Sequence, residues 1–186
     1  MAYFLVAGGS FSLRWDGMTE SGFSVRPART SDVGSIRQLV EPLVQRRILL
    51  GKDAVVFYEA IQEFRIAVDA AGNTIGCGAL HVMWEDLAEV RTLAVVPQWL
   101  RKGVGHTLLT TLEADAVDLG LSRLFCLTFE TEFFERHGFV SMGEQTVEPD
   151  VYSEMLRSPD EGVAEFLDLA RVKPNTLGNT RMLKLL

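Results

Sequence analysis

The stretch from Glu89 to Leu119 constrains the fold of this chain more than any other segment. It opens with an alternating apolar run, Glu89–Val96, passes through a turn at Arg101–His106 and ends in a helical pattern. Gly103 and Gly105 lie where a strand leads into a helix N-terminus, so unpaired backbone N–H groups can converge on an anion there. Because glycine pairs also occur in ordinary loops, this turn predicts a pyrophosphate site only in combination with the rest of the chain.

The hydrophobic pattern of the whole chain predicts a single α/β domain. Strands are expected over Phe23–Pro27, Phe64–Asp69, Thr74–Trp84, Glu89–Val96, Leu121–Phe129, Phe139–Val147 and Met182–Leu185. Helices are expected from Val33 to a weak end at Pro42, and over Asp53–Glu63, Val104–Leu119, Glu130–Arg136 and Asp150–Arg171, the last with a break at Ser158–Asp160. This order places helices on a mostly antiparallel sheet. We expect the domain to span residues 23–186, and the glycine-containing residues 1–22 to form a flexible extension.

Composition excludes several classes of function. The net charge of −7 argues against a nucleic-acid partner, because phosphate backbones select clustered Lys and Arg. Cys77 and Cys126 each lie inside an apolar run, which favours buried thiols in a reducing compartment over a disulfide or metal site. The three histidines have no ligand spacing, and no apolar run reaches membrane-spanning length. We therefore expect a soluble cytoplasmic protein without a bound metal.

Three motifs together resemble the GNAT (Gcn5-related) N-acetyltransferase superfamily. They are a strand ending in Leu93–Val95, the turn Arg101–Gly105 before a helix, and the segment Phe133–Phe139 after a further strand. Within the superfamily the chain is similar to the short stand-alone amino-acid N-acetyltransferases, the N-acetylglutamate synthases of bacterial arginine biosynthesis. The closer resemblance is carried by Phe57–Phe64, Ile75–Leu80, Glu89–Val95, Leu127–Phe139 and the tail Gly162–Leu186.

The resemblance implies a fold and a co-substrate. It implies the GNAT fold, a mixed, mostly antiparallel central sheet with splayed strands and flanking helices, in which acetyl-CoA enters where two neighbouring strands part. The pantetheine arm would pair with the strand backbone, the pyrophosphate would lie at the glycine turn, and a short helix would lie beside the arm. The residues implied for these contacts are Leu93, Ala94 and Val95, then Arg101, Lys102, Gly103, Val104, Gly105 and His106, and finally Phe134.

Acetyl transfer to an α-amine needs a group that removes a proton and donors for the developing oxyanion. Glu89 alternates with Arg91 on one face of a strand, so a base and an anion-binding guanidinium can point to the same side. Taken without the family, the same pattern also fits a solvent-facing ion pair. Thr128 is the candidate proton donor to the departing thiolate, although a strand threonine can instead bond to the main chain. The candidate cations for substrate carboxylates are Lys52, Arg91 and Arg181.

The substrate stays open between L-glutamate and L-glutamine, because the amide keeps the size of the acid and removes one charge. Two other functions also stay open. One is acetylation of another small amine or a protein terminus. The other is an acetyl-CoA-binding module without turnover, because Phe134 stands where many members place a tyrosine acid and Leu100 stands where many place Gln or Arg. GNAT proteins commonly form dimers, so a homodimer is an additional expectation.

Overall fold

A computed structural model describes residues 22–143, 147–172 and 178–186, and its centre is a seven-stranded mixed sheet. The predicted extension 1–22 lies outside the described residues except for Gly22, and β1 begins at the next residue. The strand order is β1-β2-β3-β4-β5-β7-β6. The strands are β1 (Phe23–Pro27), β2 (Phe64–Asp69), β3 (Thr74–Trp84), β4 (Leu87–Val95), β5 (Arg123–Thr128), β6 (Val140–Ser141) and β7 (Thr180–Leu185).

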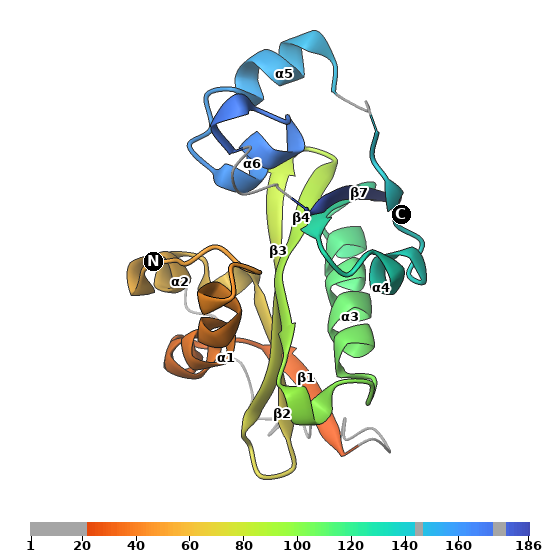
Figure 1. Cartoon of the computed structure of the whole chain (residues 1–186). Coiled ribbons are helices and arrows are strands. Elements are labelled where there is room, and N and C mark those ends of the chain that lie inside the picture. Colours follow the sequence, from red (N-terminus) through yellow and green to blue (C-terminus); the bar gives the residue numbers. More distant parts are fainter. Residues whose placement is uncertain (1–21, 144–146, 173–177) are drawn as a thin grey trace, which may run out of the picture.

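Helices cover both faces of this sheet. They are α1 (Val33–Gln45), α2 (Ala54–Glu59), α3 (Val104–Asp118), α4 (Thr131–Glu135), α5 (Pro149–Met155) and α6 (Glu161–Phe166). Figure 1 shows α1 and α2 on one side of the sheet, α3 and α4 on the other, and α5 and α6 at the end where β3 turns into β4. This arrangement confirms the predicted α/β architecture with a mostly antiparallel sheet.

Separate hydrophobic clusters hold these layers together. One joins α3 and α4 to the sheet through residues such as Leu112, Leu124 and Phe134, and a second joins α1 and α2 to the other face through Ile36 and Phe57. A third cluster packs α5 and α6 against the ends of β4, β5 and β7. Burying large side chains of this kind contributes about 1.5–3 kcal/mol each, so the third cluster also stabilises the packing of α6 on the strand ends.

Several predicted elements were wrong in extent, among them the helix predicted over Asp53–Glu63, which ends at Glu59. The strand predicted over Phe139–Val147 is reduced to β6, because the chain turns at Gly143, whose φ is +59°, and residues 144–146 are not described. The final strand is longer than predicted, and it inserts between β5 and β6. Helix α1 continues past Pro42, whose carbonyl accepts a hydrogen bond from Arg46 N–H at 3.3 Å.

The parallel pair β4 and β5 is joined over only three residue pairs. These are Leu87 with Arg123, Ala88 with Leu124 and Glu89 with Phe125. Although both strands are fully described and both continue beyond this point, they form no further pairs. The strands therefore part after Glu89, and this confirms the splayed strands that the family resemblance implies.

A bulge in β4 sets which residues face the opening. Cys77 of β3 pairs with Ala94 and Ala79 pairs with Arg91, so Thr92 and Leu93 together lie opposite Gly78. Thr92 takes a left-handed conformation, with φ +57°, as one residue of a bulge often does. The extra residue turns Leu93 toward α3, where its side chain would touch a Cβ placed on Gly78. Glu89 and Arg91, before the bulge, keep the opposite face.

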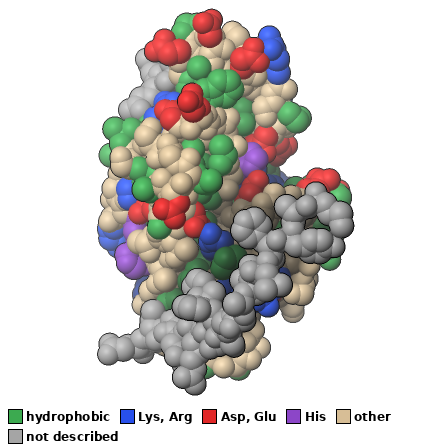
Figure 2. Space-filling view, turned by 180° about the vertical axis from the view of Figure 1, so that it is seen from behind, with side chains coloured by type: hydrophobic (Ala, Val, Ile, Leu, Met, Phe, Trp, Pro, Cys, Tyr) green, Lys and Arg blue, Asp and Glu red, His purple; other side chains and the backbone are tan. Residues whose placement is uncertain are grey.

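The described surface carries many acidic side chains, in agreement with the net charge of −7. Figure 2 shows Asp and Glu side chains gathered at the end of the molecule that carries α5, with Lys and Arg interspersed rather than joined into a stripe. Among the described residues no helix is long and apolar enough to cross a membrane, and no group of three or more His, Cys, Asp or Glu is arranged to hold a metal ion.

Candidate active site

Glu89 and Arg91 project from β4 toward the layer that contains α6. The alternation of a strand places them on one face, and Nε of Arg91 lies 3.6 Å from Oε2 of Glu89. Both atoms are buried, and within the described residues neither has a hydrogen-bond partner. The predicted pair is therefore an interior pair beside the point where β4 and β5 part, and the alternative of a solvent-facing ion pair does not hold.

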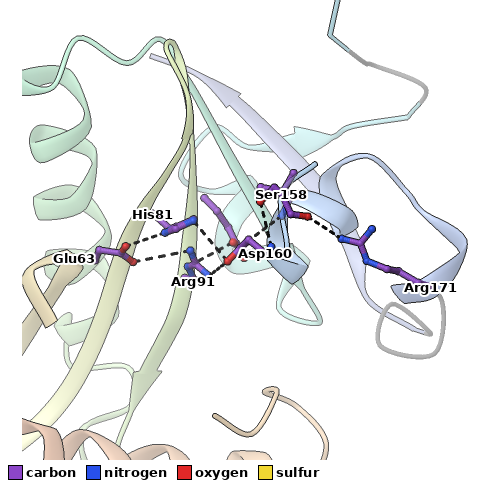
Figure 3. Close-up of polar contacts among 8 residues, drawn as sticks. Glu63, His81, Arg91, Ser158, Asp160 and Arg171 are labelled. Atoms are coloured by element: carbon purple, nitrogen blue, oxygen red, sulfur yellow. Dashed lines mark hydrogen bonds and ion pairs between the residues drawn. The ribbon is translucent and has the colours of Figure 1, made fainter. Parts of the chain in front are cut away.

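Three further side chains, from segments far apart in the chain, surround Arg91. Nη1 of Arg91 donates to Oδ2 of Asp160 at 3.0 Å, and its Nη2 lies 4.0 Å from Oε2 of Glu63. His81 bridges these two carboxylates, with Nδ1 2.9 Å from Glu63 and Nε2 3.7 Å from Asp160 (Figure 3). The guanidinium charge is thus shared among three carboxylates, including Glu89.

The loop before α6 holds Asp160 in place. Its Oδ1 accepts a hydrogen bond from Val163 N–H at 3.1 Å, which caps α6, and its own N–H donates to Oγ of Ser158 at 3.2 Å. Arg171 donates to the carbonyl of Ser158 at 3.4 Å (Figure 3). The two oxygens of the Asp160 carboxylate therefore link the start of α6 to Arg91 on β4.

Burial and the neighbouring carboxylates change the acidity of Glu89. This side chain is 6% exposed, and burial together with the nearby Glu165 and Asp160 carboxylates raises its pKa from 4.5 to about 8. Lys52 acts in the opposite direction and partly offsets the rise. A carboxylate with a pKa near neutrality exchanges a proton readily at physiological pH, which is the property of a general base or acid.

Lys52 reaches the same cluster from the loop before α2. It is partly buried, and its pKa is lowered overall by burial and by the Arg91 charge. The carboxylates of Glu89, Asp160 and Glu63 oppose this shift without cancelling it. Two of the three predicted substrate cations, Lys52 and Arg91, therefore lie within electrostatic reach of each other and of Glu89. A site with two cations is suited to a ligand that carries carboxylates.

The third predicted cation, Arg181, has other contacts. Its Nη1 donates to the carbonyl of Phe166 at 3.0 Å and its Nη2 to the carbonyl of Gly143 at 3.1 Å, and Asp168 lies 3.9 Å away. These contacts join β7 to the end of α6 and to the turn after β6. The structure does not bring the guanidinium of Arg181 into the Glu89–Arg91 cluster, so its role toward the substrate stays a prediction.

The turn before α3 has the conformation expected of an anion-binding loop. Arg101 and Gly103 both take left-handed backbone conformations, with φ +62° and +84°, and α3 begins at Val104. Alternation of left-handed and right-handed residues curves successive N–H groups into a concave nest. The Nζ of Lys102 lies 5.0 Å from the centre of the Trp99 ring, which holds this cation beside the turn.

His106, in the first turn of α3, contacts the segment after α4, whereas Phe134 lies in the core. Nδ1 of His106 lies 2.9 Å from Nε2 of His137, whose own Nδ1 lies 2.7 Å from the carbonyl of Phe133. Phe134 is buried in the core, edge-on to Phe133, whereas the Phe133 ring lies within 3.5 Å of a Cβ placed on Gly105. Contact of Phe134 with a co-substrate stays a prediction.

Thr128 ends β5 on the other side of the opening. It is 8% exposed, and its Oγ1 accepts a hydrogen bond from Glu130 N–H at 2.9 Å. A hydroxyl that accepts one hydrogen bond still carries its own hydrogen to donate. The main-chain bond considered for this side chain is therefore present, and it is compatible with the proposed donor role.

Sequence reasoning did not find Glu63, His81 and Asp160. Each of them lies in a different segment, no spacing in the sequence links these segments, and only the folded chain brings them to Arg91. The break predicted at Ser158–Asp160 was the one available signal, because Asp at a helix start is a common cap.

Comparison with known proteins identifies the class. Residues 40–139, more than half of the chain, match the acetyltransferase (GNAT) family. A Mycobacterium tuberculosis protein described as an amino-acid acetyltransferase is 55% identical over 164 residues, which cover 87% of this chain and 94% of that protein. The chain therefore belongs to the GNAT acetyltransferase family, and it is an acyltransferase.

Two solved structures refine the comparison. A crystal structure from M. tuberculosis, in complex with CoA and a second ligand, has 55% identity and a TM-score of 0.84, and the match covers 88% of this chain and 99% of that one. The N-acetylglutamate synthase of Neisseria gonorrhoeae, complexed with coenzyme A and N-acetyl-glutamate, has 30% identity and a TM-score of 0.68. That match covers 88% of this chain and 35% of the longer Neisseria protein. Within the family the chain is thus similar to amino-acid acetyltransferases.

Proposed function

We propose that this chain transfers the acetyl group of acetyl-CoA to the α-amine of L-glutamate or L-glutamine, the first step of arginine biosynthesis. The observation that carries the proposal is the convergence of Glu89, Arg91 and Lys52 beside the point where β4 and β5 part. The amino-acid acetyltransferase relatives, one solved with CoA and N-acetyl-glutamate, support the choice of substrate class.

The co-substrate end of the site lies along β4 and the turn before α3. Backbone groups of Leu93 and Val95 on the β5 side have no strand partner from β5, so they are available to the pantetheine amides. The N–H groups from Arg101 to Gly105 and the cation of Lys102 would hold the pyrophosphate. Each charge-assisted contact of this kind contributes about 1.5–3 kcal/mol, so a few of them suffice for binding.

The chemical step needs a proton to leave the ammonium of the substrate. In the proposal Glu89 accepts it, directly or through water, and the free amine attacks the thioester carbon. The unpaired N–H groups of β4 stabilise the oxyanion, and the C–S bond breaks as the tetrahedral intermediate collapses. Thr128 or ordered water protonates the leaving thiolate and is restored by the second proton that the substrate nitrogen loses as the amide forms. A raised pKa makes the ionised form of Glu89 a stronger base than an ordinary carboxylate, and this form increases as the pH rises toward 8.

Substrate carboxylates would replace protein carboxylates around the two cations. Arg91 holds Asp160 and Glu63 in the free protein, and its fork of donors matches a carboxylate in two-point contact. Lys52, beside Arg91 and Glu89, offers a second charge. A cytoplasmic location belongs to the same proposal, because Cys77 and Cys126 are buried free thiols of the kind a reducing compartment preserves.

The experiment is an assay of thiol release from acetyl-CoA with a panel of amino acids, with the product identified by mass spectrometry. The proposal predicts release with L-glutamate or L-glutamine and a mass increase of one acetyl group on the amino acid. Amines without a carboxylate, such as putrescine, are the matched control and should give background release. Binding of acetyl-CoA without release for any amino acid would contradict the proposal and support the non-catalytic module.

A further inference from the structure

Helix α6 lies directly over the Glu89 carboxylate. Gly162, in the first turn of α6, is buried, and a methyl group placed on its Cα would overlap Oε2 of Glu89 and lie 2.8 Å from its Cδ. That same Oε2 is buried and, among the described residues, has no hydrogen-bond partner. The end of the Glu89 side chain therefore occupies the space that a side chain at position 162 would need.

Glycine is needed at position 162 because no room is left for a side chain, and not because of the backbone conformation. The φ angle of Gly162 lies outside the left-handed region, so its backbone does not require glycine. Glycine also weakens helices relative to alanine, because it loses more conformational freedom on folding. Gly34, in α1, has the opposite surroundings, since a Cβ placed there meets nothing within 4 Å. The two helical glycines thus form a natural comparison.

Glu165 follows Gly162 by three residues, so both point from the same face of α6. It is 5% exposed, and of the charged groups around Glu89 it is the one with the largest effect on that carboxylate. Burial, with Glu161 and Asp160, raises the pKa of Glu165 to about 7. The groups that act on Glu89 from the surrounding elements are Glu165 and Asp160 of the α6 segment, Lys52 before α2, Glu63 before β2, Arg91 on β4 and Cys126 on β5.

We propose that α6 is a positioning element for acetyl transfer, in which Gly162 leaves the space that fixes the Glu89 carboxylate and Glu165 faces that carboxylate with a second one. This inference rests on the proposed function, because it assigns Glu89 the role of base. Gly162 and Glu165 act through Glu89 and have no direct contact with the reacting atoms in the proposal. A second carboxylate disfavours the charged form of Glu89 and so keeps its pKa near neutrality.

The first test is Gly162→Ala with Gly34→Ala as its matched control. The added methyl group meets the far end of a flexible side chain, so the variant should fold while the carboxylate moves. Because misplacement of a catalytic group by about 1 Å can lower the rate about 100-fold, we expect kcat to fall roughly 10- to 100-fold. The dissociation constant of acetyl-CoA should stay unchanged, and Gly34→Ala should keep wild-type kcat.

The second test is Glu165→Gln, which keeps the shape of the side chain and removes its charge. Removal of a like charge lowers the pKa of Glu89, so the acid limb of the kcat/KM profile should move to lower pH. The plateau at high pH should stay near the wild-type value. A purely structural role would lower the whole profile without moving its limb.

The double variant Glu89→Ala with Gly162→Ala tests the contact without any activity. If the methyl group meets the Glu89 carboxylate, the unfolding midpoint should fall less in the Glu89→Ala background than in wild type. Equal effects in both backgrounds would overturn the inference. The inference would also be overturned if Gly162→Ala kept the wild-type kcat and Glu165→Gln left the acid limb of the kcat/KM profile at its wild-type pH. Failure of the proposed function itself appears differently, as wild-type protein that binds acetyl-CoA and releases no thiol with any amino acid, whereas an active Glu89→Gln enzyme would remove only the role of Glu89 as base.

Discussion

The Nε atom of Arg91 lies 3.6 Å from Oε2 of Glu89, and both atoms are buried without a hydrogen-bond partner among the described residues. Leaving a buried polar group unpaired costs about 1–3 kcal/mol, and native proteins contain few such groups. A substrate carboxylate would supply a partner for Nε of Arg91, whereas Oε2 of Glu89 is covered by Gly162 of α6. We interpret the unpaired Nε of Arg91 as a place where the substrate binds.

Replacement of Arg91 by lysine tests the anion-binding part of this interpretation. Arg91→Lys keeps the charge and loses the two-pronged donor, so the KM of the amino acid should rise roughly 10- to 100-fold, in line with a charge-assisted contact of about 1.5–3 kcal/mol. The KM of acetyl-CoA should change less than twofold. Arg157→Lys is the control, because Arg157 pairs with Glu154 on the exposed surface. An unchanged KM for the amino acid would exclude Arg91 from substrate binding.

Gly103 tests the turn that is proposed to hold the pyrophosphate. Its φ of +84° lies in the left-handed region, so Gly103→Ala should destabilise the protein by about 1–2 kcal/mol. Straining the nest should also weaken CoA binding, measured by calorimetry. Gly72 is the matched control, with φ +83° and equally open surroundings in the β2–β3 hairpin. If Gly72→Ala and Gly103→Ala weaken CoA binding equally, the turn does not bind the cofactor.

The raised pKa values predict how stability depends on pH. Glu89 with a pKa of about 8 and Glu165 with a pKa of about 7 hold protons in the folded state that the unfolded chain releases near 4.5. Folding stability should therefore fall as pH rises from about 5 to 8, by at most about 1.4 kcal/mol per pH unit for each group. Urea unfolding at several pH values measures this slope.

The variant Glu89→Gln separates the contribution of Glu89 to this slope. Glutamine stays neutral at every pH, so the decline between pH 5 and 8 should become shallower. A decline as steep as that of the wild type would mean that Glu89 titrates normally. Glu154→Gln, on the exposed surface, should leave the slope unchanged.

Local patterns were sufficient to predict most of the fold. The β1 strand has its predicted bounds, Phe23–Pro27, and the helix break at Ser158–Asp160 separates α5 from α6. Local patterns failed where tertiary pairing decides, as in the short β6, which ends at Ser141 just before the Gly143 turn, and in β7, which inserts between β5 and β6. Hydrophobic alternation reports which face of a strand is buried but not which strand lies beside it.

The candidate site was predictable only along β4. Glu89 and Arg91 are two residues apart, so strand alternation alone places them on one face. Their partners Glu63 and Asp160 come from positions before β2 and before α6, and no local spacing connects those positions. Local spacing also could not show that Arg181 donates to the carbonyls of Phe166 and Gly143, and its role toward the substrate stays a prediction.

The rate of acetyl transfer in a single turnover tests the central claim most directly, because it isolates the chemical step from product release. With wild type and Glu89→Gln saturated with acetyl-CoA and mixed with the amino acid, we predict a rate roughly 10²- to 10⁴-fold lower in the variant, the usual contribution of a positioned base. The dissociation constant of acetyl-CoA should be the same in both proteins. A Glu89→Gln rate within threefold of wild type would contradict the claim that this carboxylate removes the proton.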